Sequence, residues 1–155
     1  MVRSMGEFRT LSWIALGGVL GALGRYGLDV WGAGDRPTTP QDYPMVTLTI
    51  NLVGCLGIGV LAPLLIAQPR WIHARAFLIT GVLGGFTTYS AFAAENGLLL
   101  LDGAGAGSAA YIAVTLAGGL LAVSWGRWIS ARIVRRVAPG PATGLGLNTG
   151  EDEIR

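Results

Sequence analysis

Four apolar runs, each close to twenty residues long, are the feature that most restricts the fold of this sequence. They cover residues 11–28, 46–67, 76–101 and 109–129. A membrane-spanning helix needs roughly 20 apolar residues, and lipid-exposed backbone can satisfy its polar groups only in helices or a closed barrel. The runs therefore predict an all-α integral membrane protein with four spans, in a membrane domain over residues 1–137.

The composition of the chain agrees with this class. Hydrophobic residues make up 52% of the sequence, charged residues 13%, and the mean hydropathy is +0.55. The first run follows Arg3 and Arg9 as a signal peptide would, but it ends at Arg25 without a small-x-small cleavage site and three more runs follow it. We therefore interpret it as a span. Residues 138–155 have the composition of a disordered tail.

The third run carries a helix-breaking sequence at its centre. As a continuous helix, 76–101 would be about 39 Å long, enough to cross a bilayer. Gly84 and Gly85 weaken helix propagation, whereas Thr87 and Thr88 favour helix N-caps. We predict a broken helix whose first half ends near Gly84 and whose second half begins near Thr87 or Thr88.

A helix break at this depth has two interpretations. Backbone groups freed from a helix must face protein, an ion or a wet cavity, because hydrocarbon offers them no partner. The aromatic rings of Tyr89 and Phe92, three residues apart, share one face of the second half. The stretch is either a kink packed by aromatic side chains or a binding site of the kind that broken membrane helices form for ions.

Several polar side chains in or near the spans are candidates for function, and each has a plainer alternative. We interpret Asn51 as the only strong amide in a span, either a donor to an anion or an interhelical hydrogen bond. Arg25 either serves a function or extends to the interface. Glu95 either lines a vestibule or is hydrated there. His73 lies in a short basic loop, where a solvated surface histidine is the favoured interpretation.

Two function classes, enzymes and nucleic-acid binders, receive no support from the sequence, and two others, a small multidrug-type antiporter and a structural subunit, remain as alternatives. It contains no paired carboxylates within the spans, no nucleophile triad, no phosphate loop and no metal-ligand spacing, so we expect no enzyme. The net charge of +2 arises from arginines flanking the spans rather than from a nucleic-acid patch. A small multidrug-type antiporter would need a membrane-embedded acid, and only Glu95 is available. A purely structural subunit would not need Asn51 or the broken helix.

Three motifs, in this order, make the chain resemble the Fluc, or CrcB, family of fluoride channels over residues 17–126. They are Gly18-x-x-Gly21-Ala22-x-x-Arg25-Tyr26, Thr47-Leu48-x-x-Asn51-x-x-Gly54 and Gly84-Gly85-Phe86-Thr87-Thr88-Tyr89-Ser90-x-Phe92. The chain departs from the usual family pattern at Tyr89, commonly Phe, and at Ala91, commonly Thr. Tyrosine keeps the ring edge at position 89 but adds a hydroxyl group, so the position is not purely aromatic.

The resemblance implies an antiparallel dimer of four-helix subunits with two narrow fluoride pathways and passive efflux that lowers cytoplasmic fluoride. The implied pathway residues are Asn51, Tyr89, Ser90, Phe92 and Thr115. Amide, hydroxyl and positive ring-edge groups replace the water around a small anion, and a buried cation in the path would hold it too tightly.

The resemblance also implies a structural sodium ion at the subunit interface, held by the backbone carbonyls of Gly84 and Thr87. One central cation would offset the cost of bringing two anion pathways into a low-dielectric region.

The distribution of arginines predicts the orientation and the partner of the chain. Four spans put both termini and the 68–75 loop on one side, with Arg3, Arg9, Arg70, Arg75, Arg127, Arg132, Arg135 and Arg136. The other side has Arg25 and Arg36. Basic residues near span ends favour the cytoplasm, so we predict cytoplasmic termini in the cell membrane. A chain of fixed orientation cannot be its own antiparallel mate, which predicts a heterodimer with a homologous subunit; a dual-topology homodimer is the alternative.

Overall fold

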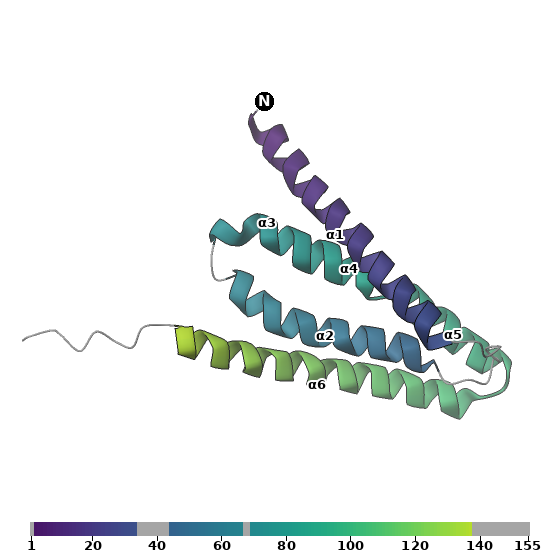
Figure 1. Cartoon of the computed structure of the whole chain (residues 1–155). Helices are drawn as coiled ribbons and strands as arrows, with labels where there is room; N and C mark the ends of the chain where they lie inside the picture. The colour runs from purple at the N-terminus through teal and green to yellow at the C-terminus, as the bar shows by residue number, and fades with distance from the viewer. Residues whose placement is uncertain (1, 34–43, 67–68, 138–155) are drawn as a thin grey trace, which may run out of the picture.

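The structure, a computed structural model, describes residues 2–33, 44–66 and 69–137, and these residues are helical apart from short connections. Figure 1 shows the elements, whose bounds are α1 (Val2–Ala33), α2 (Met45–Ile66), η1 (Pro69–Trp71), α3 (Ile72–Arg75), η2 (Ala76–Leu83), α4 (Gly84–Phe86), α5 (Tyr89–Leu101) and α6 (Gly105–Val137). No strand occurs in the described part of the chain. The predicted tail, 138–155, lies outside the described residues.

Four helical segments are long and apolar enough to cross a membrane. They are Gly6–Gly32, Met45–Ile66, Ile72–Leu101 and Gly105–Arg136. This confirms the predicted all-α class with four spans. The first and last helices run beyond their apolar centres into arginine-bearing turns, because arginine is a good helix former and helical structure does not stop where hydrophobicity does.

The helices associate as two close pairs. The first span packs along the π-helical segment η2 and the short helix α4, and α2 packs along α6. Glycine permits both approaches: a Cβ at Gly21 would lie 2.1 Å from the Val82 carbonyl oxygen, and one at Gly59 would lie 2.4 Å from the Val123 carbonyl oxygen. Small residues are the usual means by which membrane helices bring their backbones together.

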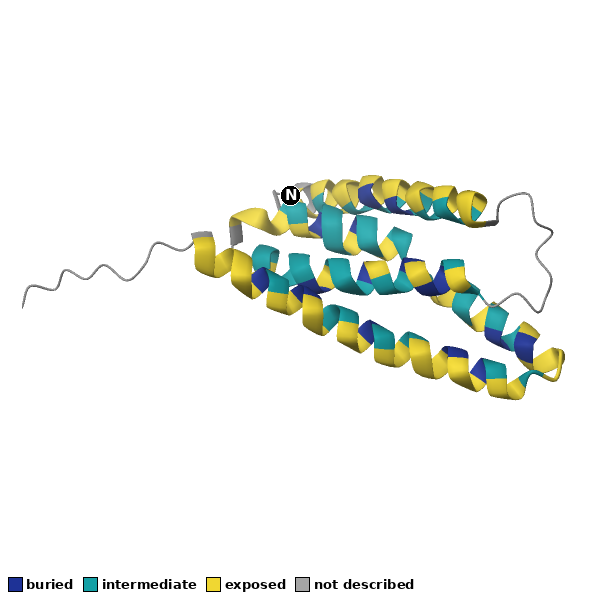
Figure 2. Ribbon diagram, turned by 60° about the horizontal axis from the view of Figure 1, so that its bottom comes forward, coloured by how far each residue is buried: buried dark blue, intermediate teal, exposed yellow. Residues whose placement is uncertain are grey.

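Most of the helix surface faces outward. Figure 2 shows that α1 and α6 are largely exposed, whereas α2 and the η2–α4 part of the third span are mostly at intermediate exposure, with few buried positions on any helix. The described hydrophobic residues that are buried are Leu48, Ile50, Ala76, Leu99 and Tyr111. Apolar side chains that point outward from a membrane span need lipid or another subunit around them.

The third span is irregular over much of its length. Residues Ala76–Leu83 form a π-helix, an arrangement that the sequence analysis did not foresee. The α-helix continues through Gly84 and Gly85 to Phe86, so the predicted end near Gly84 was two residues too early. Glycine lowers helix propensity by only about 1 kcal/mol, and packing against α1 outweighs this: a Cβ at Gly85 would lie 2.4 Å from the Gly18 carbonyl oxygen.

Candidate functional site

The α-helical path of the third span is interrupted at two residues. Thr87 has φ −77° and ψ 155°, and Thr88 has φ −141° and ψ 125°, both in the extended region. The helix α5 begins at the next residue, Tyr89. Thr88 is its N-cap, because the Thr88 hydroxyl accepts a 3.2 Å hydrogen bond from the Ala91 N–H. This is the cap chemistry that threonine favours.

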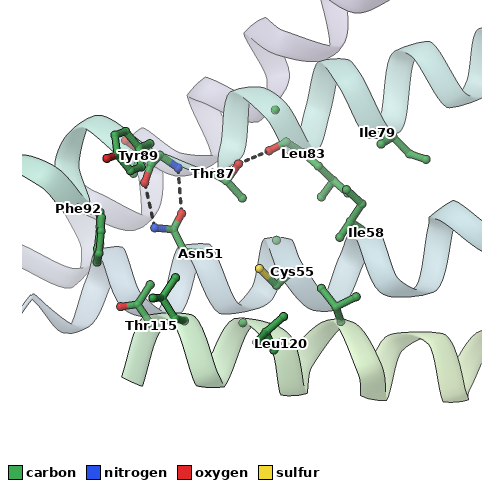
Figure 3. A pocket seen from close by; sticks show the side chains of 16 residues that line it. Asn51, Cys55, Ile58, Ile79, Leu83, Thr87, Tyr89, Phe92, Thr115 and Leu120 are labelled. Atoms are coloured by element: carbon green, nitrogen blue, oxygen red, sulfur yellow. Dashed lines mark hydrogen bonds between the residues drawn. The ribbon is translucent and has the colours of Figure 1, made fainter. Parts of the chain in front are cut away.

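Asn51 of α2 binds the interruption with both ends of its amide. Its Nδ2 donates to the Thr88 carbonyl at 2.9 Å, and its Oδ1 accepts from the Thr88 N–H at 2.9 Å. Figure 3 shows these two bonds as dashed lines between α2 and the break. Asn51 thus supplies the acceptor that the Thr88 N–H would have had in a continuous helix, and it adds a donor to the carbonyl of this N-cap residue. Among the described residues no acceptor meets the second N–H of this amide, which remains available as a donor.

These bonds leave two carbonyl groups without their helical donors. In a continuous helix the Gly84 carbonyl would accept from the Thr88 N–H and the Thr87 carbonyl from the Ala91 N–H. Asn51 takes the first of these donors, and the Thr88 hydroxyl takes the second. The broken helix therefore presents backbone oxygens at the two positions, Gly84 and Thr87, that were expected to hold a cation.

Arg25 of α1 lies beside the same break. Its side chain is half-buried, and its Nε donates to the Gly85 carbonyl at 3.4 Å. A continuous helix would have paired that carbonyl with the Tyr89 N–H. The guanidinium therefore occupies the level of the break at the centre of the third span and partly satisfies a carbonyl, as basic side chains do at helix C-termini.

The aromatic residues form a chain of rings beside the break. Tyr89 is 80% exposed, and its ring centroid lies 6.1 Å from that of Phe92. The Phe92 centroid lies 5.2 Å from that of Tyr111, which is fully buried. Both contacts are tilted, the geometry that lets ring edges remain accessible. Tyr89 and Phe92 therefore share a face, as their spacing predicts.

Of the two remaining pathway residues predicted from the sequence, Thr115 lines the cavity and Ser90 does not. Thr115 of α6 lines the cavity next to Asn51, and its buried hydroxyl has no hydrogen-bond partner among the described residues. Ser90 is exposed, shares a 3.2 Å contact with the Thr88 hydroxyl and does not line the cavity.

Glu95 is held by two hydroxyl groups. Its carboxylate accepts from the Thr47 hydroxyl at 2.6 Å and from the Tyr111 hydroxyl at 2.8 Å. Thr47 and Tyr111 are both buried, so Glu95 links α2, α5 and α6 through polar groups inside the subunit. It is a constrained side chain, not a freely hydrated one.

A cavity of about 700 Å³ opens along α2, the third span and α6. Its polar lining comes from the residues just described, and Figure 3 shows Asn51, Tyr89, Phe92 and Thr115 at one end of it. The other end is lined by apolar side chains and glycines, among them Cys55, Ile58, Leu83, Leu120 and Val123. Uncharged donors and ring edges thus gather at one end of an apolar groove.

The chain matches the model of a known family. The family is described as CrcB-like protein, Camphor Resistance (CrcB), and the match covers residues 12–127. This chain belongs to the CrcB family. The matched region runs from within the first span to Arg127 of the last, and it contains every residue of the break.

Several relatives of this CrcB chain are similar over most of their length. A fluoride-specific ion channel FluC of Chloroflexus aurantiacus is 41% identical over 124 residues, 74% of this chain and 93% of the relative. FluC 1 of Streptomyces coelicolor is 39% identical over 79% of this chain and 77% of its own length. FluC 2 of Listeria innocua is 35% identical over 81% and 94%. With its four candidate spans, this CrcB protein is a multi-pass membrane protein.

The structure also assigns contacts that the sequence analysis missed. Asn96 is 8% exposed and is a second amide within the spans, so Asn51 is not the only one. Its Oδ1 accepts a 2.8 Å hydrogen bond from the hydroxyl of Ser108, which is 2% exposed. The signal that would have found them is the polarity of both residues on faces that otherwise carry apolar side chains.

Replacing Tyr89 with phenylalanine should leave ion flux within about twofold of wild type. The Tyr89 hydroxyl makes no hydrogen bond among the described residues, and the ring edge, the group that suits an anion, is retained. Phe92→Ile should lower flux by roughly tenfold, because an aliphatic side chain has no positive edge. Fluoride efflux from liposomes measures both. A large loss in Tyr89→Phe would make the hydroxyl a ligand and contradict the ring-edge assignment.

Proposed function

We propose that this protein is a subunit of a fluoride channel that lets fluoride leave the cell passively. The observation that carries the proposal is the Asn51 amide, which is bound to both backbone groups of Thr88 and whose second N–H meets no acceptor among the described residues, in the cavity that Phe92 and Thr115 also line. Relatives that bear the name fluoride-specific ion channel support it.

The chemistry of the site suits a small dehydrated anion. Fluoride loses its water only where other donors replace it, and the free Asn51 N–H, the Thr115 hydroxyl and the ring edges of Phe92 and Tyr89 are such groups. All are uncharged, so they bind the ion without trapping it. The acidic and the basic side chain described beside the site are themselves engaged: Glu95 accepts from two hydroxyl groups, and Arg25 donates to a backbone carbonyl.

A proton-coupled antiporter is disfavoured by the state of Glu95. Such a mechanism needs a membrane-embedded acid that alternates between substrate and proton. Here both carboxylate oxygens already accept hydrogen bonds from Thr47 and Tyr111. Purified protein in liposomes loaded with fluoride should release it down its gradient at equal internal and external pH. Release that requires a proton gradient would favour the antiporter.

We infer that a second, antiparallel subunit covers the groove. Gly84 is exposed, and a Cβ there would meet no atom within 4 Å, so packing inside the subunit does not require glycine at this position. A close neighbour from another chain would explain it, since small residues allow backbones to approach. A partner would also cover the apolar lining of the cavity and the backbone of the break.

The partner that the charges favour is a homologous subunit with the opposite charge bias. By sequence, the terminal side of this chain carries nine of its eleven arginines, the eight named above and Arg155. Arg25, counted on the opposite side, lies at the level of the break and not at a helix end, which increases the asymmetry. The chain should therefore insert with both termini in the cytoplasm of a plasma membrane. A terminus-location reporter on this chain alone tests this: signal from both sides would indicate a dual-topology homodimer.

We further propose that the carbonyls of Gly84 and Thr87, with those of the second subunit, hold a structural sodium ion. Backbone oxygens are the ligands that hard cations prefer. Within the described residues no cluster of three or more His, Cys, Asp or Glu offers a side-chain site. The backbone N–H groups that would donate to these two carbonyls in a continuous helix donate instead to Asn51 and to the Thr88 hydroxyl. The residues present therefore fit the ion.

If the ion is structural, fluoride flux should not depend on a sodium gradient. Efflux with equal sodium on both sides and efflux with sodium outside only should agree within about twofold, because no sodium moves with the anion. Removing sodium throughout should instead lower the thermal stability of the assembled protein. Fluoride transport stoichiometrically coupled to sodium would contradict the structural assignment.

A further inference from the structure

The second half of the third span is held by α6 rather than by the first half of its own span. The helix α5 packs on α6, with a smaller contact to α2, whereas η2 and α4 pack on α1. The two halves are joined by the extended residues Thr87 and Thr88. Extended residues do not transmit the orientation of one helix to the next. The position of Phe92, on α5, therefore depends on how α5 is attached to α6.

One attachment is a buried pair of polar side chains. The Ser108 hydroxyl of α6 donates to the Asn96 Oδ1 of α5 at 2.8 Å. The other end of the Asn96 amide donates to the Phe92 carbonyl at 2.8 Å. Asn96 is 8% exposed and Ser108 is 2% exposed. The pair thus connects α6 directly to the backbone of the residue that carries the pathway aromatic ring.

A second attachment lies one turn further along α6. Tyr111 is three residues from Ser108 and shares its face; its ring packs on Phe92 with centroids 5.2 Å apart, and its hydroxyl donates to Glu95. A single contact would leave α5 free to rotate about its axis. Two contacts on neighbouring turns fix both the rotation of α5 and its position along α6.

We propose that Asn96 and Ser108 are positioning residues that set the orientation of the Phe92 ring toward the ion pathway. The inference rests on the proposed fluoride function, and it assigns to this pair a role beyond stability. The surroundings strengthen it, because Phe92 packs beside the buried Leu48 and Leu99. Among the described contacts, the Asn96–Ser108 pair alone connects α6 to the Phe92 backbone through hydrogen bonds.

The test compares breaking the pair with replacing it. Ser108→Ala leaves the Asn96 oxygen buried and unpaired, so both thermal stability and fluoride efflux should fall; the loss of efflux should be roughly three- to tenfold, the size expected for one interhelical hydrogen bond in a membrane. The double variant Asn96→Leu/Ser108→Ala removes both polar groups with little change of shape. Its stability should return close to wild type, while efflux stays low because no hydrogen bond then connects α6 to the Phe92 carbonyl through Asn96.

A readout independent of transport reports the position of the ring itself. A fluorinated phenylalanine incorporated at Phe92 should give one sharp fluorine NMR signal in the wild type and several signals or a broad one in the double variant. Ser124→Ala is the matched control: that hydroxyl of α6 also makes a 2.8 Å bond, but to the Leu120 carbonyl of its own helix on an exposed face. It should change none of the readouts.

Two outcomes separate this inference from the proposed function. If the double variant recovers wild-type efflux and a single sharp signal together with its stability, the pair serves stability only and the positioning role is wrong. If the wild type releases no fluoride at all, the proposed function fails, and the NMR comparison still decides whether Asn96 and Ser108 hold the ring.

Discussion

Asn51→Asp should abolish fluoride efflux, lowering it by at least roughly a hundredfold, which corresponds to about 2.7 kcal/mol in the barrier. A carboxylate has no N–H to donate, so one of its oxygens would face the Thr88 carbonyl where Nδ2 now lies 2.9 Å away. The other effect is direct repulsion of the anion: two unit charges 4 Å apart interact by about 4 kcal/mol at an effective dielectric of 20. Fluoride efflux from liposomes measures the loss.

The matched control for this prediction is Thr49→Val. Thr49 lies two residues away on the same helix, but it is exposed and its hydroxyl bonds to the Met45 carbonyl of that helix. Its loss should leave efflux unchanged. The aspartate variant must also elute as the same assembled species as the wild type. Efflux retained at wild-type rate in assembled Asn51→Asp would remove Asn51 from the pathway.

Gly21→Ala should destabilise the subunit by about 3 kcal/mol, the upper end of overpacking effects. A Cβ at this position would lie 2.1 Å from the Val82 carbonyl oxygen and 2.8 Å from the Phe86 nitrogen. Both are backbone atoms of the third span and cannot move aside as a flexible side chain could. The first span would be pushed away from η2 and α4, and Arg25, one turn further, would lose its contact with the break.

Gly27→Ala on the same helix provides the comparison. A Cβ there would meet nothing within 4 Å, and alanine is the better helix former by up to about 1 kcal/mol. This variant should be neutral or slightly more stable. Thermal unfolding of the purified protein in detergent distinguishes the two. Equal stability of both variants would mean that α1 does not approach the third span as closely as described.

The four spans were predictable because each is defined by a property that sequence displays directly, an apolar run of the right length. The ends of α1 and α6 were not, since arginine-rich turns continue a helix without contributing to hydropathy. The π-helix of Ala76–Leu83 was missed for a different reason. Its sequence is ordinary for a membrane helix, and the register of its backbone hydrogen bonds depends on contacts with α1 that no local pattern encodes.

The sequence identified residues that line the candidate site, but it did not predict the hydrogen bonds between them. The helix α5 begins directly after the threonine pair, and Thr88 caps it through its own side chain. The glycine pair misplaced the first edge of the break, because Gly84 and Gly85 both remain helical and Gly85 permits close packing on α1 instead. That Asn51 would bind both backbone groups of Thr88 could not be read from the sequence, since the two residues are far apart along the chain and only the fold brings them together.

The most direct test is fluoride efflux from liposomes that contain the purified protein, either alone or with the homologous subunit proposed above. The central claim is that uncharged donors around Asn51 conduct fluoride through an assembled dimer. The account predicts rapid electrode-detected fluoride release at equal pH and equal sodium on both sides, no comparable chloride release, and loss of release in Asn51→Asp. Release that stops without a proton or sodium gradient, or no fluoride release from either preparation, would contradict it.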